Sequence, residues 1–228
     1  MSIPAAFKDI IIALVLFLLS GVVAAWVSGS VPGGLRLSAV VVSQGGMLVA
    51  VVGVMLARRG GRWRDIGLVA PVPGDLWRGV LAFGGCLVIN LLFVQLLWSV
   101  APDAVETHTE ELGVIARQLS HGLPFPALVA VVVFVGVYEE LFARGLLLSL
   151  CRTLLGGTWA PVVVSSLLFG LGHLYQGWIG VVQTTLIGLV LALAVIRWRT
   201  LWPAIVAHAL LDIFAMLVMT GSQGSASL

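Results

Sequence analysis

Long apolar segments follow one another along this sequence and constrain the fold more than any other feature. A helix needs about 20 apolar residues to cross a hydrocarbon core of about 30 Å. Backbone polar groups in lipid must be hydrogen-bonded internally, which favours helices. The sequence therefore predicts an all-α, polytopic membrane helix bundle with about seven transmembrane helices, within a range of six to eight. The predicted segments are Ile10 to Val27, Leu37 to Ala57, Val80 to Val100, Pro126 to Leu150, Pro161 to Tyr175, Ile179 to Trp198 and Leu201 to Met219.

Composition agrees with a protein that lies in lipid. Of 228 residues, 60% are hydrophobic and only 10% are charged, which is more apolar surface than a soluble domain of this size could bury. Seven spans with short connections use the whole length, so residues 1–228 are predicted to form a single membrane domain. The 12 basic residues lie mostly in short loops, which indicates contact with the lipid bilayer and excludes a nucleic-acid partner.

The distribution of charge between loops predicts the orientation. Basic residues crowd the connection between the second and third segments, and acidic residues dominate the next connection. We therefore expect a multi-pass protein of the cell inner (cytoplasmic) membrane, with its N-terminus in the cytoplasm. Eleven arginines against one lysine, in a background rich in Ala, Gly, Val and Leu, point to a bacterial source. The basic residues of the first connection are Arg58, Arg59, Arg62, Arg64 and Arg78, and the acidic residues of the next are Asp103, Glu106, Glu110 and Glu111.

The acidic connection from Pro102 to Gly122 is the one sizeable polar stretch on the outer side, and it is predicted to form a surface helix. His108 and His121 lie in this stretch and are interpreted as surface residues. Four glycines inside the apolar segments are expected to allow close contacts between helices, as small residues do in membranes. They are Gly136, Gly145, Gly170 and Gly172.

Apart from Arg197 at the end of the sixth segment, six acidic, basic or histidine side chains lie inside the predicted spans. Each costs on the order of several kcal/mol in hydrocarbon, so such residues are functional candidates by default. They gather in the fourth, fifth and seventh segments. They are Glu139, Glu140, Arg144, His173, His208 and Asp212.

Helical spacing predicts how these side chains pair. Glu140 and Arg144 stand four residues apart, which places a carboxylate and a guanidinium on one helix face as a supporting ion pair. Glu139 lies about 100° around the helix and has no basic partner at that spacing, so it is free to meet another helix. His208 and Asp212 also stand four residues apart, so the acid can fix the imidazole tautomer.

Helix rise places Glu139 and His173 about 15 to 20 Å from the cytoplasmic surface and His208 about 10 to 12 Å from it, so we expect the three to meet in a water-filled cavity that opens toward the cytoplasm. A buried glutamate can take a proton from water, and imidazoles can orient that water or stabilise an oxyanion. The same three residues are also plausible zinc ligands. No H-E-x-x-H motif is present, so the common zincin arrangement is absent.

Three ordered motifs resemble those of the CPBP family (CAAX protease and bacteriocin-processing, or Abi). E-E-x-x-x-R is matched by residues 139–144, F-x-x-x-H by Phe169 to His173, and H-x-x-x-N/D by His208 to Asp212. The resemblance covers 126–219. It implies an intramembrane endopeptidase in which Glu139 activates water and His173 holds it, while His208 and Asp212 stabilise the oxyanion. Phe169 is interpreted as a packing residue.

The resemblance leaves several questions open. Members have been described both as metalloproteases and as glutamate proteases; we favour metal-free catalysis, with zinc as the alternative. Asp212 stands where prenyl-protein endopeptidases usually have Asn. Because a carboxyl donates a hydrogen bond only when protonated, Asp212 either stabilises the oxyanion in that form or orients His208. The expected substrate is a peptide or membrane protein. The alternatives are a proton-coupled transporter and a non-catalytic scaffold or immunity protein.

Overall fold

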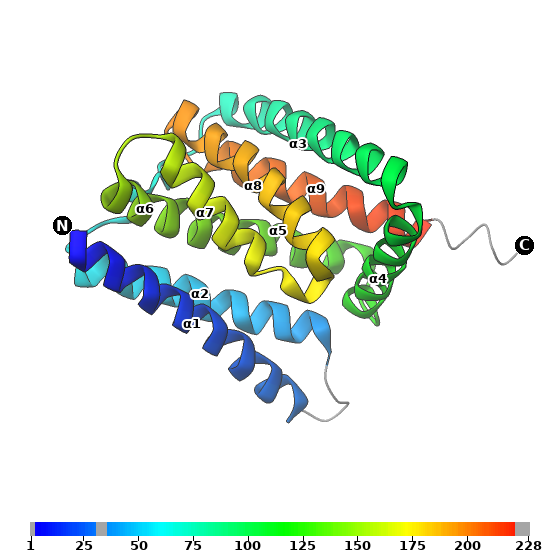
Figure 1. Cartoon of the computed structure of the whole chain (residues 1–228). Coiled ribbons are helices and arrows are strands. Elements are labelled where there is room, and N and C mark those ends of the chain that lie inside the picture. The colour runs from blue at the N-terminus through cyan, green and yellow to red at the C-terminus, as the bar shows by residue number, and fades with distance from the viewer. Residues whose placement is uncertain (1–2, 31–35, 222–228) are drawn as a thin grey trace, which may run out of the picture.

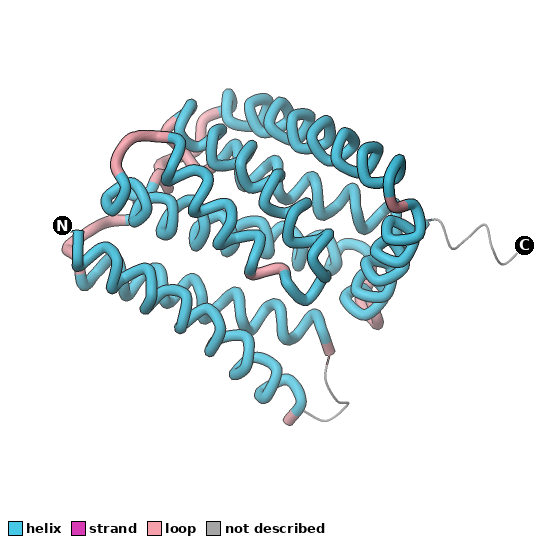
Figure 2. The backbone as a smooth tube through the Cα atoms, in the orientation of Figure 1, coloured by secondary structure: helices cyan, strands magenta, loops and turns pink. Residues whose placement is uncertain are grey.

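The computed structural model describes residues 3–30 and 36–221, and helices account for all the regular structure in these ranges (Figure 2). This agrees with the predicted all-α bundle. The helices are α1 (Ile3–Gly29), α2 (Leu37–Arg58), η1 (Trp63–Ile66), α3 (Pro73–Val100), α4 (Pro102–Ser120), α5 (Phe125–Glu140), η2 (Leu141–Leu147), α6 (Leu148–Leu155), α7 (Trp159–Leu171), η3 (Leu174–Gln176), α8 (Gly177–Trp198) and α9 (Trp202–Gly221).

Each of the seven predicted apolar segments coincides with helical structure. Six helical stretches in the described ranges are long and apolar enough to cross a membrane, and α5, η2 and α6 form one of them, Phe125–Leu155. The predicted fifth segment is the shorter α7, which has 13 residues and ends two residues before His173. Because α7 is short, His173 lies just after the end of this helix and not midway along a full span.

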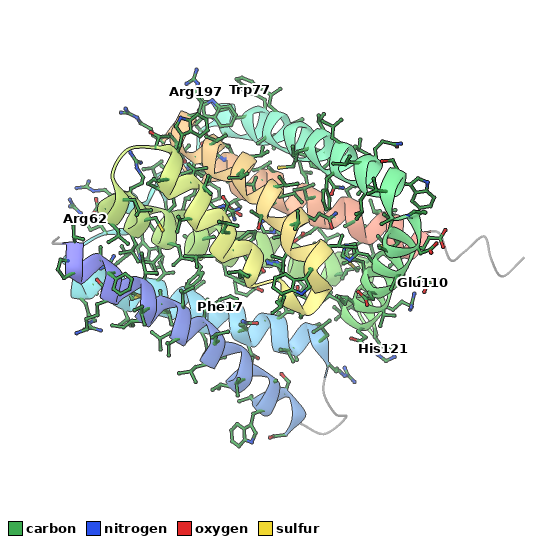
Figure 3. All side chains as sticks on the ribbon, in the orientation of Figure 1. Phe17, Arg62, Trp77, Glu110, His121 and Arg197 are labelled. Atoms are coloured by element: carbon green, nitrogen blue, oxygen red, sulfur yellow. The ribbon has the colours of Figure 1, made fainter. Side chains whose placement is uncertain are left out.

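The spans run alternately in opposite directions, so the two ends of the bundle carry different connections (Figure 1). The start of α1 and the connections α2–α3, α6–α7 and α8–α9 lie at one end. The end of α9 and the helix α4 lie at the other end. Arg62 and Arg197 appear at the first end, and Glu110 and His121 at the second (Figure 3). We call them the arginine-rich end and the acidic end.

Helix α4 runs across the acidic end of the bundle, at a steep angle to the spans (Figure 1). Its acidic residues Glu106, Glu110 and Glu111 are exposed, while Val105 and Ala116 are buried. This confirms the predicted helix in the polar connection. An amphipathic helix of this kind packs its apolar face onto the bundle and leaves the charged face in water.

The prediction for His108 was wrong, because its side chain is buried and only 8% exposed. His108 Nε2 lies 3.1 Å from Gln183 Oε1 on α8, and Gln183 Nε2 donates to Asn90 Oδ1 on α3 at 2.6 Å. This polar chain pairs one buried and two half-buried side chains, and it attaches α4 to two spans. The sequence does not show it, since the three residues come from segments far apart. His121 is exposed, as predicted.

A continuous hydrophobic core fills the arginine-rich half of the bundle. It joins α1 and α2 to η2 and α6, and it is closed at its end by Ile66 of η1 and by Leu201. The Leu201 backbone N–H donates to Gly67 O at 2.9 Å, which ties these two connections together. Fully buried members include Leu48, Val52, Leu146, Leu147, Leu150 and Leu201.

Glycines bring the functional helices into close contact, as predicted. A Cβ on Gly136 of α5 would lie 3.1 Å from the Ala209 backbone nitrogen and 3.5 Å from His208 Cβ. A Cβ on Gly170 of α7 would overlap Thr185 of α8. Gly145 and Gly172 similarly face Ile66 and Phe17. Small residues therefore set the separations between the helices that carry the ionisable side chains.

Candidate active site

The first motif lies where the longest span changes its helical form. Helix α5 ends at Glu140 and continues as the π-helix η2, whose seven residues are all buried. Arg144 Nη1 donates to Glu140 Oε1 at 2.6 Å, and the two side chains are 2% and 0% exposed. The predicted ion pair is confirmed. The π-helical turn was not predicted; such turns in an α-helix are frequent at functional sites.

Glu140 also fixes the orientation of His208. His208 Nδ1 lies 2.8 Å from Glu140 Oε1, the oxygen that accepts from Arg144. A carboxylate only accepts, so Nδ1 carries a hydrogen and Nε2 points elsewhere. Asp212 Oδ2 lies 3.8 Å from His208 Nε2, beyond hydrogen-bond distance. The carboxylate that bonds Nδ1 therefore comes from the fourth predicted segment and not from the same helix.

His173 is oriented by its own helix. It follows the last turn of α7, and its Nδ1 lies 3.0 Å from the Phe169 carbonyl oxygen. Because a carbonyl oxygen only accepts, Nδ1 is again the protonated nitrogen. His173 Nε2 then faces the space between α7, α5 and α9.

Glu139 is the residue on which both histidines converge. Its Oε2 atom lies 3.6 Å from His173 Nε2 and 3.7 Å from His208 Nε2. This oxygen is buried and receives no hydrogen bond from the described residues. When both imidazoles are neutral, Glu139 Oε2 and the two Nε2 atoms near it are all hydrogen-bond acceptors. A donor such as water can bridge them.

The Phe169 ring lies between the cationic and imidazole groups. It is 4.1 Å from the Arg144 guanidinium carbon, and its centroid is 4.8 Å from the His173 ring and 6.1 Å from the His208 ring. The guanidinium gains a cation–π contact, and both imidazoles meet the ring edge-to-face. Phe169 is therefore a structural centre of the site as well as a packing residue. Its place one turn before His173 was the signal in the sequence.

A cavity of about 460 Å³ is lined by Glu139, His173, His208 and Asp212. Its other walls come from the second half of α1, the first half of α2, α4 and the end of α9. The hydrophobic core fills the arginine-rich half, and the cavity lining includes residues of α4 and the end of α9, so the cavity extends from the site toward the acidic end. The expected opening toward the cytoplasm stays a prediction, as does the side of the membrane on which each end lies.

Further polar side chains of the cavity wall were not singled out from the sequence. Tyr175 stacks on His173 with centroids 5.8 Å apart, and its hydroxyl accepts from Gln176 Nε2 at 3.0 Å. Tyr138 and Gln44 also line the cavity. Their polarity within or beside apolar segments was the available signal, but uncharged residues are weaker indicators of function than ionisable ones.

The zinc alternative concerns Glu139, His173 and His208. Within residues 3–30 and 36–221, the structure singles out no group of three His, Cys, Asp or Glu side chains as a metal site. Glu139 Oε2 nevertheless lies 3.6 and 3.7 Å from the two Nε2 atoms, so zinc binding by these three residues stays a prediction. No step of the proposed reaction is assigned to a metal.

Comparison with protein families places this site in a known context. Residues 121–214 match the family model described as "Type II CAAX prenyl endopeptidase Rce1-like". Comparisons with curated proteins and with solved structures gave no match. The matched segment contains all three motifs and every ionisable residue of the cluster. Over this segment the chain is similar to the type II CAAX prenyl endopeptidase family.

Proposed function

We propose that this protein is an intramembrane endopeptidase that hydrolyses peptide bonds with a water molecule activated by Glu139. The observation that carries the proposal is the convergence of Glu139 Oε2 on the Nε2 atoms of His173 and His208, at 3.6 and 3.7 Å. Glu139 lines the cavity, and its Oε2 atom takes no hydrogen bond from the described protein. A carboxylate so placed is suited to be a general base.

In the proposed first step, water binds between Glu139 and His173. His173 Nε2 accepts a hydrogen bond from the water, because its Nδ1–H donates to Phe169 O. Glu139 removes the other proton as the water oxygen bonds to the carbonyl carbon of the substrate. The carbonyl oxygen becomes an oxyanion. Glu139 then returns its proton to the amide nitrogen, the C–N bond breaks, and a carboxyl and an amine product form.

His208 and Asp212 are assigned to the oxyanion. In this proposal His208 is protonated on both nitrogens, so that Nδ1–H donates to Glu140 and Nε2–H donates to the oxyanion. Asp212 Oδ2 lies 3.8 Å from the same Nε2. A protonated Asp212 carboxyl there donates a second hydrogen bond, the role that an asparagine amide fills in prenyl-protein endopeptidases.

Glu140 and Arg144 act as positioning residues in this reaction. Neither lines the cavity, and both are almost completely buried. Arg144 neutralises Glu140 and Glu140 holds His208, so the pair fixes an imidazole before substrate arrives. Groups whose geometry is set in advance need no reorganisation during the reaction.

The proposed substrate is a peptide or membrane protein whose cleaved bond reaches the bilayer interior. The basic residues at the arginine-rich end support our proposal that this end is cytoplasmic, by the positive-inside rule. In this proposal the N-terminus is cytoplasmic and the protein belongs to the inner membrane of a bacterial cell. The cavity extends toward the opposite end, so we propose that substrate approaches from the outer half of the membrane.

The test is cleavage of a quenched fluorogenic peptide panel, including lipidated and transmembrane peptides, by purified protein in nanodiscs. Glu139→Gln is expected to remove activity. Glu106→Gln, the same change on the exposed face of α4, is the matched control and should retain it. A strong chelator should leave wild-type activity unchanged; its loss would instead favour a catalytic metal. Equal activity of wild type and Glu139→Gln would overturn Glu139 as the base.

The family match supports neither alternative function. A transporter would lose flux on Glu139→Gln without any change in cleaved peptide, and a scaffold would keep its function. Both outcomes are visible in the same set of variants.

A further inference from the structure

The wall of the cavity that faces the catalytic residues is built by the hairpin of α1 and α2. Phe17 on α1 and Val40, Val41 and Gln44 on α2 all line it. These residues lie outside residues 121–214, the segment matched by the family model. The family motifs therefore supply the reacting groups, and this hairpin supplies the opposite side of the space that a substrate would occupy.

Gln44 differs from the rest of that wall. Val40, Val41 and Leu48 stand on the same helical face, and all are apolar. A Cβ on Gly21 of α1 would lie 3.4 Å from Gln44 Nε2, so this glycine leaves room for the amide beside α1. Among the described residues, no hydrogen bond joins Gln44 to another side chain or to the backbone. By contrast, Gln183 on α8 makes two hydrogen bonds to side chains.

A primary amide without a partner in an apolar cavity matches one kind of ligand well. A peptide bond about to be hydrolysed must lie in an extended segment, whose backbone N–H and C=O groups lose their helical partners. Leaving such groups unpaired in hydrocarbon is costly. The glutamine amide has one accepting oxygen and two N–H donors, so it can bond a peptide group through both polar atoms.

We infer that Gln44 binds the backbone of an extended, apolar substrate segment across the cavity from Glu139. This inference rests on the proposed function and deepens it by naming the substrate class and a residue that positions it. The apolar side chains around Gln44 favour Leu, Val and Ala side chains in that segment. The role is positioning, because Gln44 contacts the substrate backbone and transfers no proton.

The experiment uses a quenched fluorogenic peptide with a run of Leu, Val and Ala residues, and purified full-length protein in nanodiscs. Gln44→Leu removes the amide. Gln95→Leu makes the same change on α3, where Gln95 is exposed and does not line the cavity. Binding of the peptide is measured separately by fluorescence polarisation in the Glu139→Gln background, so that it does not depend on cleavage.

Gln44→Leu is expected to lower kcat/KM about tenfold, mainly through KM, and to weaken binding by a similar factor, as loss of one hydrogen bond predicts. Gln95→Leu should match wild type in both measurements. Thermal unfolding of Gln44→Leu should equal that of Gln95→Leu, since Gln44 makes no hydrogen bond to another helix among the described residues. Unchanged KM and binding would overturn the inference, and so would a large loss of thermal stability.

A depsipeptide series makes the test specific to the backbone. Each backbone N–H of the peptide is replaced in turn by an ester oxygen. In the Glu139→Gln background with Gln44 intact, one replacement should weaken binding about tenfold, and the same replacement should not weaken binding when Gln44→Leu is added. If each ester replacement weakens binding equally with and without Gln44→Leu, the inference is overturned. If peptide binding depends on Gln44 but protein with Glu139 intact does not cleave the peptide, the proposed function is contradicted instead. If the peptide does not bind to protein with Gln44 intact, the inference itself is overturned.

Discussion

His208 Nδ1 and Arg144 Nη1 donate to the same oxygen of Glu140, at 2.8 and 2.6 Å. One buried carboxylate thus links a guanidinium in its own span to an imidazole on α9. Its other oxygen, Oε2, has no hydrogen bond in the described structure. The orientation of His208 therefore depends on Glu140 at least as much as on any residue of its own helix.

Replacing Glu140 by Gln tests this link. The amide oxygen can still accept one hydrogen bond, but the charge that balances Arg144 is lost and His208 is held less firmly. Loss of such an orienting partner typically costs about 10- to 100-fold in activity. We expect a fall of this size in kcat/KM of the fluorogenic assay. Activity within twofold of wild type would show that Glu140 does not position His208.

Replacing Arg144 by Met tests the burial of the ion pair. The change leaves the buried Glu140 without its guanidinium partner and with His208 as its remaining donor, which is expected to lower the free energy of unfolding by about 3–5 kcal/mol. Arg152→Met, on an exposed position of α6, is the control and should change stability by about 0.5 kcal/mol or less. The double variant Arg144→Met/Glu140→Leu should recover part of the loss. Denaturant unfolding in detergent measures all three, and equal effects of the two arginine changes would contradict the prediction.

Asp212 is tested by comparing an amide with an aliphatic side chain. If Asp212 donates a hydrogen bond to the oxyanion, Asn can replace it, so Asp212→Asn should retain activity within about tenfold. Removing one oxyanion donor costs about 10²- to 10³-fold, and Asp212→Leu should show that loss in kcat. Comparable losses in the two variants would indicate that the carboxylate charge is what matters.

The contact between α5 and α9 is tested at Gly136. A Cβ there would press on the Ala209 backbone at 3.1 Å, so Gly136→Ala is expected to move α9 and His208 away from Glu139. Displacements near 1 Å can cost about 10²-fold in rate, and we expect a loss of at least tenfold in kcat. Gly84→Ala on α3 meets open space and should leave activity unchanged. Similar activities of the two variants would show that α5 and α9 tolerate a wider separation.

Much of the fold follows from local sequence. Runs of apolar residues near 20 in length can satisfy their backbone in lipid only as helices, which is why the seven segments and the amphipathic helix Pro102–Ser120 could be predicted. The pair Glu140 and Arg144 could be predicted too, because four-residue spacing on a helix brings two side chains together. The gathering of Glu139, His173 and His208 followed from their depth in three spans.

Other features depend on which helices pack together, and local sequence does not specify this. His208 Nδ1 bonds Glu140 and not Asp212, because close contact between Gly136 and Ala209 brings α5 beside α9. His108 is buried because Gln183 and Asn90 meet it from two other spans. The cavity extends toward the acidic end because apolar side chains from α1, α2, η2 and α6 fill the other half.

The sequence by itself determined that this chain forms membrane helices and that six ionisable side chains of the three motifs lie within them, since both follow from hydropathy and helical periodicity. Only the tertiary structure decided which nitrogen of each histidine faces Glu139, which carboxylate holds His208 and where the amide of Gln44 lies relative to them. Those relationships join residues up to about 160 positions apart, and they arise from long-range packing of helix faces, which short-range patterns do not encode.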